Sequence, residues 1–346
     1  MGYNFGIVGL GLIADFHAEA IQAMPKGQVV AGVDISEERV AAFSKRFGCR
    51  GYASLPEMLK QPGLDIVTIC TPSGYHMESA LQVIEAGKHV IVEKPLEITL
   101  EKCDAIIEAA RQQGVRVATI FPSRFHETSQ AIKRAVDGHR FGTITMADAY
   151  VKWYRSQEYY DKGGWHGTKA VDGGGALMNQ SIHAIDLLQW FMGPVHSVHA
   201  YTDMLGHEGV EVEDTAVAIL RFRNGAMGVI EGSTAVFPGY LKRIEIGGTR
   251  GSVILEESAL KSWSFKDETD EDERIRKEFF ADADSGGGAS DPAAISFKPH
   301  QLQFEEFIDS LESGRPSKVE DSEGRRAVEI ILAIYESARS GSEVLL

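Results

Sequence analysis

The segment His89 to Pro95, which reads HVIVEKP, places a lysine where a strand is expected to end. Its apolar, β-branched residues at 90–92 are typical of a strand buried inside a parallel sheet. Pro95 biases Lys94 toward an extended backbone. Open α/β sheets bind their ligands outside the carboxyl ends of the strands, so Lys94 is the leading candidate for the group that does the chemistry.

A second group of polar residues lies in the segment Asp172 to Trp190. Glycines at the head of the segment permit close approach of another backbone and mark the start of a predicted helix. Asn179, His183 and Asp186 fall at the helical spacings i, i+4 and i+7, which predicts that their side chains share one face. A lone histidine in such a helix is more often a core residue, but the aligned amide and carboxylate favour a site.

The chain begins with a predicted strand, a glycine turn and a helix. The apolar run Phe5 to Val8 leads into Gly9-Leu10-Gly11-Leu12-Ile13-Ala14, the GxGxxG/A pattern of a dinucleotide-binding turn. Gly9 permits the tight turn, and Gly11 leaves the backbone open to a pyrophosphate. The N–H groups at the start of the helix would bind the phosphate charge.

The second predicted strand, Val29 to Val33, is followed directly by Asp34, 20 residues after Ala14. A carboxylate at this spacing accepts hydrogen bonds from the adenosine ribose and repels a 2′-phosphate, which favours NAD over NADP. The alternative is that Asp34 only caps the helix that starts near Ser36.

Strands and helices go on alternating to about residue 122, which predicts a doubly wound Rossmann domain over residues 1–122. Its loops from Thr71-Pro72, Glu93 and Phe121 are expected to line one edge of the sheet. His76, which follows the first of these loops, either contacts a ligand or caps its own helix.

Residues 123–346 have a different pattern, in which strands are joined by short turns such as Arg223-Asn224-Gly225. This pattern predicts an α+β domain with a large, mainly antiparallel open sheet. Two amphipathic helices, Gln301 to Ser313 and Glu323 to Arg339, are expected to close the chain. The acidic, glycine-rich stretch Lys266 to Ser290 is interpreted as a solvated loop.

Composition limits the classes of partner. At 346 residues the chain is long enough for two domains, and its formal charge of -15 opposes binding to nucleic acid. No apolar run approaches the roughly 20 residues that cross a bilayer, and the first residues lack the pattern of a secretory signal, so we expect a cytoplasmic protein without a membrane partner. The three cysteines form no CxxC, which favours core packing over a disulfide or metal site.

Taken together, these motifs resemble the Gfo/Idh/MocA oxidoreductases, the family of glucose-fructose oxidoreductase and inositol dehydrogenase. The resemblance covers nearly the whole chain. It is carried by Gly9 to Ala14, Thr71-Pro72, Glu93-Lys94-Pro95, Arg124-Phe125, Phe141-Gly142, Asp172 to His183, and the pattern around Phe304 and Ala333 to Gly341.

The resemblance implies an NAD-dependent oxidoreductase that acts on a secondary hydroxyl of a sugar, polyol or sugar derivative. Lys94 and His183 match the family's catalytic lysine and histidine, so the hydroxyl proton would pass to one of them while hydride passes to nicotinamide. The family often has an aspartate where this chain has Asn179. An amide cannot exchange a proton, so Asn179 would orient the substrate. The Asn179-Gln180 variant is similar to family members that act on nucleotide-linked sugars.

Either Lys94 or His183 could be the base. The reference pKa of lysine, about 10.4, is too high for a base at neutral pH, but desolvation and a nearby cation can lower it. Histidine, at about 6.5, needs less adjustment. Glu93 would act in the opposite direction on Lys94 if it were close, but neighbouring strand side chains point to opposite faces, so Glu93 is expected to point away and serve structure.

Two sets of contacts follow from these motifs, and no metal is expected in either. The cofactor contacts are expected from Gly9, Gly11, Leu12, Ile13, Asp34, Thr71, Pro72, His76, Glu93 and Lys94. The substrate contacts are expected from Lys94, Arg124, Lys152, Tyr154, Trp165, His166, Asn179 and His183. Tyr154 and Trp165 could instead simply pack, and Lys152 could lie on a solvated strand face.

Two other functions stay open. One is a redox-neutral enzyme that retains NAD, of the epimerase or glycosidase type. The other is a non-catalytic dinucleotide sensor that regulates a protein partner, against which Lys94 and His183 both argue. The resemblance also implies a homodimer or homotetramer formed through the sheet of the second domain.

Overall fold

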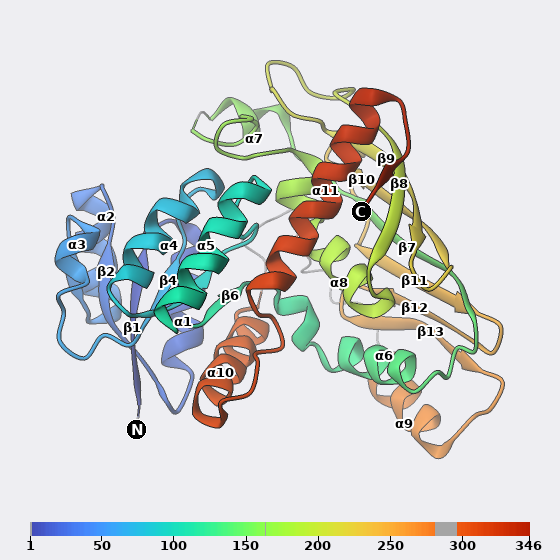
Figure 1. The fold of residues 1–346 in the computed structure, drawn as a ribbon, viewed down its shortest axis with the longest axis horizontal. Coiled ribbons are helices and arrows are strands. Elements are labelled where there is room, and N and C mark those ends of the chain that lie inside the picture. The colour runs from blue at the N-terminus through green and yellow to red at the C-terminus, as the bar shows by residue number, and fades with distance from the viewer. Residues whose placement is uncertain (1, 163, 281–295) are drawn as a thin grey trace. The chain divides into compact units, whose positions relative to one another are not determined.

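The computed structural model describes residues 2–162, 164–280 and 296–346, and Figure 1 shows their helices and strands. The chain divides into two compact units. The first comprises Met1–Pro122, Ala170–Gly173 and Ser296–Val328, and the second comprises Ser123–Lys169, Gly174–Ile295 and Glu329–Leu346. Residues 170–173 and 296–328, which the sequence pattern assigned to the second domain, therefore belong to the first unit. None of the described helices is long and apolar enough to cross a membrane.

The first unit contains a six-stranded parallel sheet in the order β3-β2-β1-β4-β5-β6, which is the order of a Rossmann fold. The central strands are buried along almost their whole length, as expected where helices cover both faces of a parallel sheet. The strands are β1 Tyr3–Val8, β2 Gly27–Val33, β3 Arg50–Tyr52, β4 Ile66–Ile69, β5 His89–Val92 and β6 Val117–Thr119.

Helices pack on this sheet through apolar stripes. Helix α10 buries Phe304 and Phe307, and the Phe304 ring packs edge-on against Phe5 at 6.0 Å. This stripe explains why the segment that contains α10 joins the first unit. Figure 1 shows α4 and α5 side by side, where they contact each other. The helices are α1 Leu12–Gln22, α2 Glu37–Phe47, α3 Leu55–Met58, α4 His76–Glu85, α5 Leu100–Gln113 and α10 Lys298–Ser313.

The second unit contains an eight-stranded sheet in the order β13-β12-β11-β7-β10-β9-β8-β14. Strands β7 and β10 are parallel and the other neighbours are antiparallel, which confirms the predicted mainly antiparallel sheet. Strand β9 alternates buried and exposed residues, because only one face of the sheet faces the core. The strands are β7 Ile144–Lys152, β8 Val195–Asp203, β9 Thr215–Phe222, β10 Met227–Ser233, β11 Arg243–Gly248, β12 Gly251–Glu256, β13 Ala259–Phe265 and β14 Val344–Leu345.

Helix α8 contacts β7 and β11, and α6 contacts α8. The helical segments of this unit are η2 Pro122–Phe125, α6 Glu127–Asp137, α7 Gln157–Asp161, the π-helical η3 Ala176–Ser181, α8 Ile182–Met192 and α9 Asp270–Phe279. Helix α11, Asp321–Ser340, passes from the residues of the first unit to those of the second.

The acidic stretch was predicted to be a solvated loop, but part of it is a helix. Its residues Asp270–Phe279 form α9, which begins with a capping box between Thr269 and Asp272. Asp272 is fully buried, and it accepts hydrogen bonds from both Arg140 and Trp263. Burial raises the pKa of Asp272, but these hydrogen bonds outweigh burial and hold it well below its usual range. Residues 281–290 of the predicted loop lie outside the described residues.

Candidate active site

Lys94 lies just beyond the carboxyl end of β5 and is half-buried. Strand β4 is hydrogen-bonded to β5 on one side and to β1 on the other. The loops after these parallel strands therefore meet at one edge of the first unit's sheet. Those loops carry Gly9 to Gly11, Thr71-Pro72 and Glu93-Lys94, so the structure brings Lys94 and the predicted cofactor residues of the first unit to the same edge.

The glycine turn has the shape that a pyrophosphate needs. Gly9 has a φ of +84°, and a Cβ there would lie 2.8 Å from the Cys70 carbonyl oxygen, so only glycine fits. A Cβ on Gly11 would meet no protein atom within 4 Å, so the space beside its backbone is open. Among the described residues, no side chain caps α1 at Gly11. The first N–H groups of α1 are therefore available to an anion, and the residues fit the phosphates of NAD.

Asp34 is held by two backbone N–H groups. Its carboxylate accepts hydrogen bonds from Leu10 N at 2.7 Å and from Ser36 N at 2.8 Å. The cap of α2 is Ser36, whose hydroxyl accepts from Arg39 N, so the alternative in which Asp34 caps that helix is wrong. Each carboxylate oxygen has a second lone pair, which leaves acceptors for the two ribose hydroxyls. Ile35 beside it is fully exposed.

His76 neither caps its helix with its side chain nor has a ring nitrogen left for a ligand, contrary to both alternatives. The ring is 1% exposed, with Nδ1 2.8 Å from the Pro95 carbonyl oxygen and Nε2 2.9 Å from that of Thr71. Burial lowers the pKa of His76, against the two carbonyl groups, which raise it. The ring links the loop after β4 to the loop that carries Lys94, and so it positions both.

Glu93 points into the core beneath Lys94. Its Oε1 lies 2.8 Å from Nε2 of His17, a residue on the buried face of α1. Its Oε2 accepts the backbone N–H of Lys94 at 3.1 Å. This agrees with the expectation that Glu93 serves structure, while its contact with the cofactor stays a prediction.

Asn179 and His183 lie where a π-helical turn passes into α8, and both are half-buried. Single π turns inside helices are often found at functional sites. The turn begins at Gly175, where a Cβ would lie 1.9 Å from the Glu213 carbonyl oxygen. The Glu213 carboxylate accepts from Gly175 N and Leu177 N, and it thereby caps the turn. Burial raises the pKa of Glu213, and these hydrogen bonds only partly offset that effect.

One prediction for this helix is wrong, and the predicted contact of Arg124 with substrate stays a prediction. Asp186 does not share a face with a ligand site, because it is fully buried and forms a bidentate ion pair with Arg124. Arg124, predicted to contact substrate, is 1% exposed, and its guanidinium also lies 5.4 Å from the centre of the Trp190 ring. The π turn changes the helical spacing, so the i, i+7 relationship expected of an α-helix does not hold.

Arg155 and Gln180 extend a chain of hydrogen bonds to Asn179; the sequence analysis named Gln180 only as part of the Asn179-Gln180 variant and missed Arg155. Arg155 is 4% exposed, and its Nη2 donates to Gln180 Oε1 at 2.8 Å. Gln180 Nε2 in turn donates to Asn179 Oδ1 at 3.0 Å. A chain of hydrogen bonds thus runs from a buried guanidinium to the amide that is predicted to orient the substrate.

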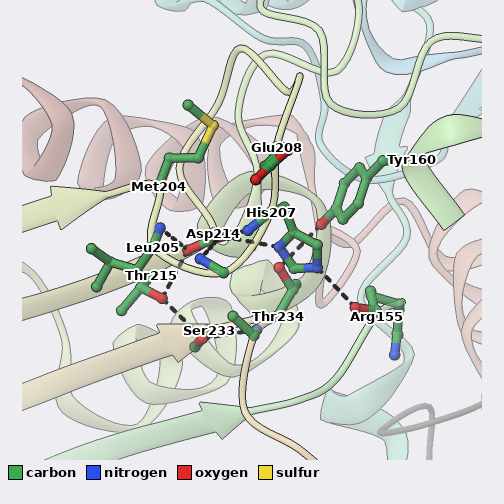
Figure 2. Close-up of polar contacts among 12 residues, drawn as sticks. Arg155, Tyr160, Met204, Leu205, His207, Glu208, Asp214, Thr215, Ser233 and Thr234 are labelled. Atoms are coloured by element: carbon green, nitrogen blue, oxygen red, sulfur yellow. Dashed lines mark hydrogen bonds and ion pairs between the residues drawn. The ribbon is translucent and has the colours of Figure 1, made fainter. Parts of the chain in front are cut away.

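The backbone of Arg155 is fixed by a second cluster, around Asp214 (Figure 2). One carboxylate oxygen of Asp214 accepts from His207 Nδ1 at 3.0 Å, and His207 Nε2 lies 2.8 Å from the Arg155 carbonyl oxygen. The same carboxylate also accepts from the backbone N–H groups of Leu205, Gly206 and His207. Burial raises the pKa of Asp214, but these hydrogen bonds outweigh burial and lower it.

The remaining predicted substrate residues are in an aromatic segment and on a strand. Trp165 lies against His166 with ring centres 4.0 Å apart, and His166 stacks on Tyr159. Tyr154 packs edge-on against Phe237 at 5.2 Å. Lys152 forms an ion pair with Glu231 at 2.6 Å, which agrees with the strand-face alternative. Their contact with substrate stays a prediction.

Comparison with known proteins agrees with this geometry. Residues 3–121 match the model of the oxidoreductase family with an NAD-binding Rossmann fold, and residues 129–254 match the Gfo/Idh/MocA C-terminal domain. The chain is 27% identical to myo-inositol 2-dehydrogenase of Thermotoga maritima over 99% of this chain and 98% of that protein. D-glucoside 3-dehydrogenase of Escherichia coli is 26% identical over 98% of this chain and 96% of its own length.

Solved structures extend the comparison. The WlbA dehydrogenase from Bordetella pertussis, in complex with NADH and UDP-GlcNAcA, is 34% identical, covers 100% of this chain and 98% of its own, and has a TM-score of 0.90. A levoglucosan dehydrogenase, at 23% identity and a TM-score of 0.87 over 100% of this chain and 99% of its own, shows the same fold. The chain therefore belongs to the Gfo/Idh/MocA family and is an oxidoreductase with an NAD-binding Rossmann domain.

Proposed function

We propose that this enzyme oxidises a secondary hydroxyl of a nucleotide-linked sugar, with NAD as hydride acceptor and Lys94 or His183 as proton acceptor. The observation that carries the proposal is the place of Lys94, half-buried at the sheet edge that also holds the glycine turn and Asp34. The 34% identity with a dehydrogenase solved with UDP-GlcNAcA supports a nucleotide-linked substrate. Relatives named for inositol and glucosides make a free polyol or sugar the second candidate.

NAD, when bound, supplies the carbon that accepts the hydride. Gly11 and the first N–H groups of α1 would hold its phosphates, and Asp34 would accept the adenosine ribose hydroxyls. Asn179, supported by Gln180 and Arg155, would bind a substrate hydroxyl without exchanging a proton. The proton of the reacting hydroxyl would pass to Lys94 or to His183, because both side chains can take one.

A substrate panel tests the first part of the proposal. UDP-linked sugars, the corresponding free sugars and inositols are each incubated with NAD and with NADP, and nicotinamide reduction is followed by absorbance. We expect reduction of NAD with at least one UDP-linked sugar at the highest kcat/KM. Higher kcat/KM for a free sugar or polyol would replace the nucleotide-linked class, and a preference for NADP would contradict the role of Asp34.

Substitution of Lys94 tests the second part. Lys94→Met should abolish turnover while the Kd of NAD stays nearly unchanged, because the glycine turn and Asp34 are untouched. Lys60→Met, which removes an exposed lysine of the same unit, is the matched control. Turnover retained in Lys94→Met would refute the assignment of Lys94.

The redox-neutral alternative predicts a different observation. An enzyme that retains NAD would carry the dinucleotide through purification and form product without releasing free NADH. Denaturing the purified protein and measuring the released nicotinamide separates the two functions.

The open face of the second unit's sheet supports a homodimer or homotetramer. Tyr201 is 75% exposed, its cross-strand neighbour Val217 is 45% exposed, and Ile219 on the same strand is 58% exposed. Met227 and its neighbour Met146 extend this apolar surface, each at 49%. Contiguous apolar side chains of this kind mark association surfaces in water-soluble domains.

A further inference from the structure

A buried pair formed by His17 and Glu93 adjoins the backbone of Lys94, the proposed base. His17 is fully buried, Glu93 is 6% exposed, and Nε2 of His17 lies 2.8 Å from Oε1 of Glu93. The second oxygen of Glu93 accepts the N–H of Lys94, the next residue along the chain. The carboxylate therefore stands between the buried ring and the backbone of Lys94.

The ring has a partner on its other nitrogen as well. Nδ1 of His17 lies 2.8 Å from the Thr68 hydroxyl, and the Cys70 sulfur is 3.4 Å away. The Thr68 hydroxyl can either accept from Nδ1 or donate to it, so that contact fits a protonated ring and a neutral ring alike, whereas an ionised carboxylate only accepts, so Nε2 donates to Glu93. A buried carboxylate needs a partner of opposite charge, and the His17 ring, 2.8 Å from Glu93, is placed to be that partner.

The electrostatics of the site agree with this geometry. Burial lowers the pKa of His17, but the contacts with Cys70 and Glu93 outweigh burial and raise it to about 10. Burial raises the pKa of Glu93, but the hydrogen bond and charge of His17, with the charges of His300 and Lys94, lower it to about 2. Both shifts favour the charged form of each group at neutral pH, in agreement with an ion pair at this distance.

We infer that His17 is a positioning residue that neutralises Glu93, so that this carboxylate does not hold the proton on Lys94. The inference rests on the proposed role of Lys94 as base. A carboxylate beside an ammonium group favours its charged form, which would make Lys94 a poorer proton acceptor at neutral pH. With His17 charged, Glu93 can fix the Lys94 backbone without this effect.

Other titratable side chains lie near the His17–Glu93 pair. The Cys70 sulfur lies 3.4 Å from Nδ1 of His17, and the centre of the His300 ring lies 5.6 Å from that of the His17 ring. His76 interacts with Glu93 and Glu97 through charge. His17, Glu93 and His300 could together hold a metal ion, since their ligand atoms lie within 4.8 Å of one another. The 2.8 Å separation of His17 and Glu93 is that of a hydrogen bond, so we assign a proton to it.

The test is a double-substitution cycle read by the pH profile of kcat/KM. His17→Gln leaves Glu93 without its counter-charge, so the midpoint of the acid limb should rise by about one pH unit. Glu93→Gln and the double variant His17→Gln/Glu93→Gln remove the carboxylate, so their midpoints should stay within about 0.3 unit of wild type. If the substitutions acted only through lost packing, activity would fall in the variants at these buried positions, but the acid-limb midpoint of His17→Gln would stay at the wild-type value.

Two measurements without turnover complete the test. Histidine-selective ¹⁵N NMR of the full chain should show an imidazolium signal that persists at pH 8, that is absent in His17→Gln, and that titrates at lower pH in Glu93→Gln. Acetylation of Lys94, followed by mass spectrometry as a function of pH, should shift to higher pH only in His17→Gln.

Three results would overturn the inference. They are a neutral His17 at pH 8, an unshifted Lys94 acetylation profile in His17→Gln, and loss of activity on dialysis against a chelator, which would indicate a metal at this cluster. If His17→Gln does not fold, the double variant and Glu93→Gln still test the inference, because a raised acid-limb midpoint in either variant would contradict it. Failure of the proposed function is recognised separately, since only that failure leaves Lys94→Met active.

Discussion

Arg155 donates a 2.8 Å hydrogen bond from Nη2 to Oε1 of Gln180, the residue next to Asn179. Gln180 uses its amide nitrogen to hold Asn179 at 3.0 Å. A rigid second layer of this kind determines how precisely a substrate-orienting group is placed.

Gln180→Leu should therefore lower kcat/KM about fivefold, since the lost hydrogen bond to the Asn179 amide is worth about 1 kcal/mol. The Kd of NAD should stay unchanged, because the glycine turn is untouched. Gln112→Leu, on the exposed face of α5, is the control. Steady-state kinetics and titration of NAD check this. A loss of NAD affinity as large as the loss in kcat/KM would contradict it.

The buried pair of Arg124 and Asp186 predicts a stability effect. Arg124→Met leaves a buried carboxylate without its partner and should destabilise the protein by about 3–5 kcal/mol, and Arg124→Met/Asp186→Leu should recover most of this loss. Denaturant unfolding gives the free energies. A substrate-binding Arg124 would instead show a raised KM with an unchanged unfolding midpoint.

Two glycines of one turn should respond differently. Gly9→Ala places a Cβ 2.8 Å from the Cys70 carbonyl oxygen at a φ of +84°, so it should lower the melting temperature. Gly11→Ala meets no protein atom within 4 Å and should leave the melting temperature nearly unchanged while weakening NAD binding about tenfold or more. Thermal unfolding without and with NAD separates the two effects. Unchanged NAD affinity in Gly11→Ala would argue against this placement of the pyrophosphate.

The His17–Glu93 pair also predicts how stability depends on pH. The pKa of His17 is raised to about 10, so its contribution is full below about 6.5 and is lost as the pH rises toward 10. The pKa of Glu93 is lowered to about 2, so its contribution is present above about 4.5 and is lost as the pH falls toward 2. Urea midpoints of wild type should fall between pH 7 and 10 more steeply than those of His17→Gln/Glu93→Gln. Parallel curves would show that the pair is not charged.

The apolar face of the second sheet predicts assembly. Ile219→Glu should shift the protein toward the monomer in light scattering, because it places a charge among exposed apolar side chains. Leu205→Glu changes a side chain that is 71% exposed but lies in a loop, and it should leave the mass unchanged. A wild-type protein that is already monomeric would refute the proposed interface.

Local sequence patterns were sufficient for most of the elements and for the shape of the glycine turn. The period of apolar residues predicts the strands of both sheets except β3 and β14, and Gly9, Gly11 and Asp34 follow a spacing that the strand–turn–helix geometry itself imposes. Lys94 was identifiable because a β-branched run and a proline fix it at a strand end. His17 carried an available signal, as a polar residue on the otherwise apolar face of α1.

Only the tertiary structure decided which polar groups pair. Arg124 and Asp186 neutralise each other across 62 residues of sequence, and Glu93 finds His17 across 76. No local spacing encodes such partners, since the cost of burying a charge can be met by any oppositely charged group that the fold brings near. For the same reason, Asn179 and His183 could be named from the sequence, whereas the Arg155 and Gln180 support behind Asn179 became visible only once the π turn and its neighbouring segment were in place.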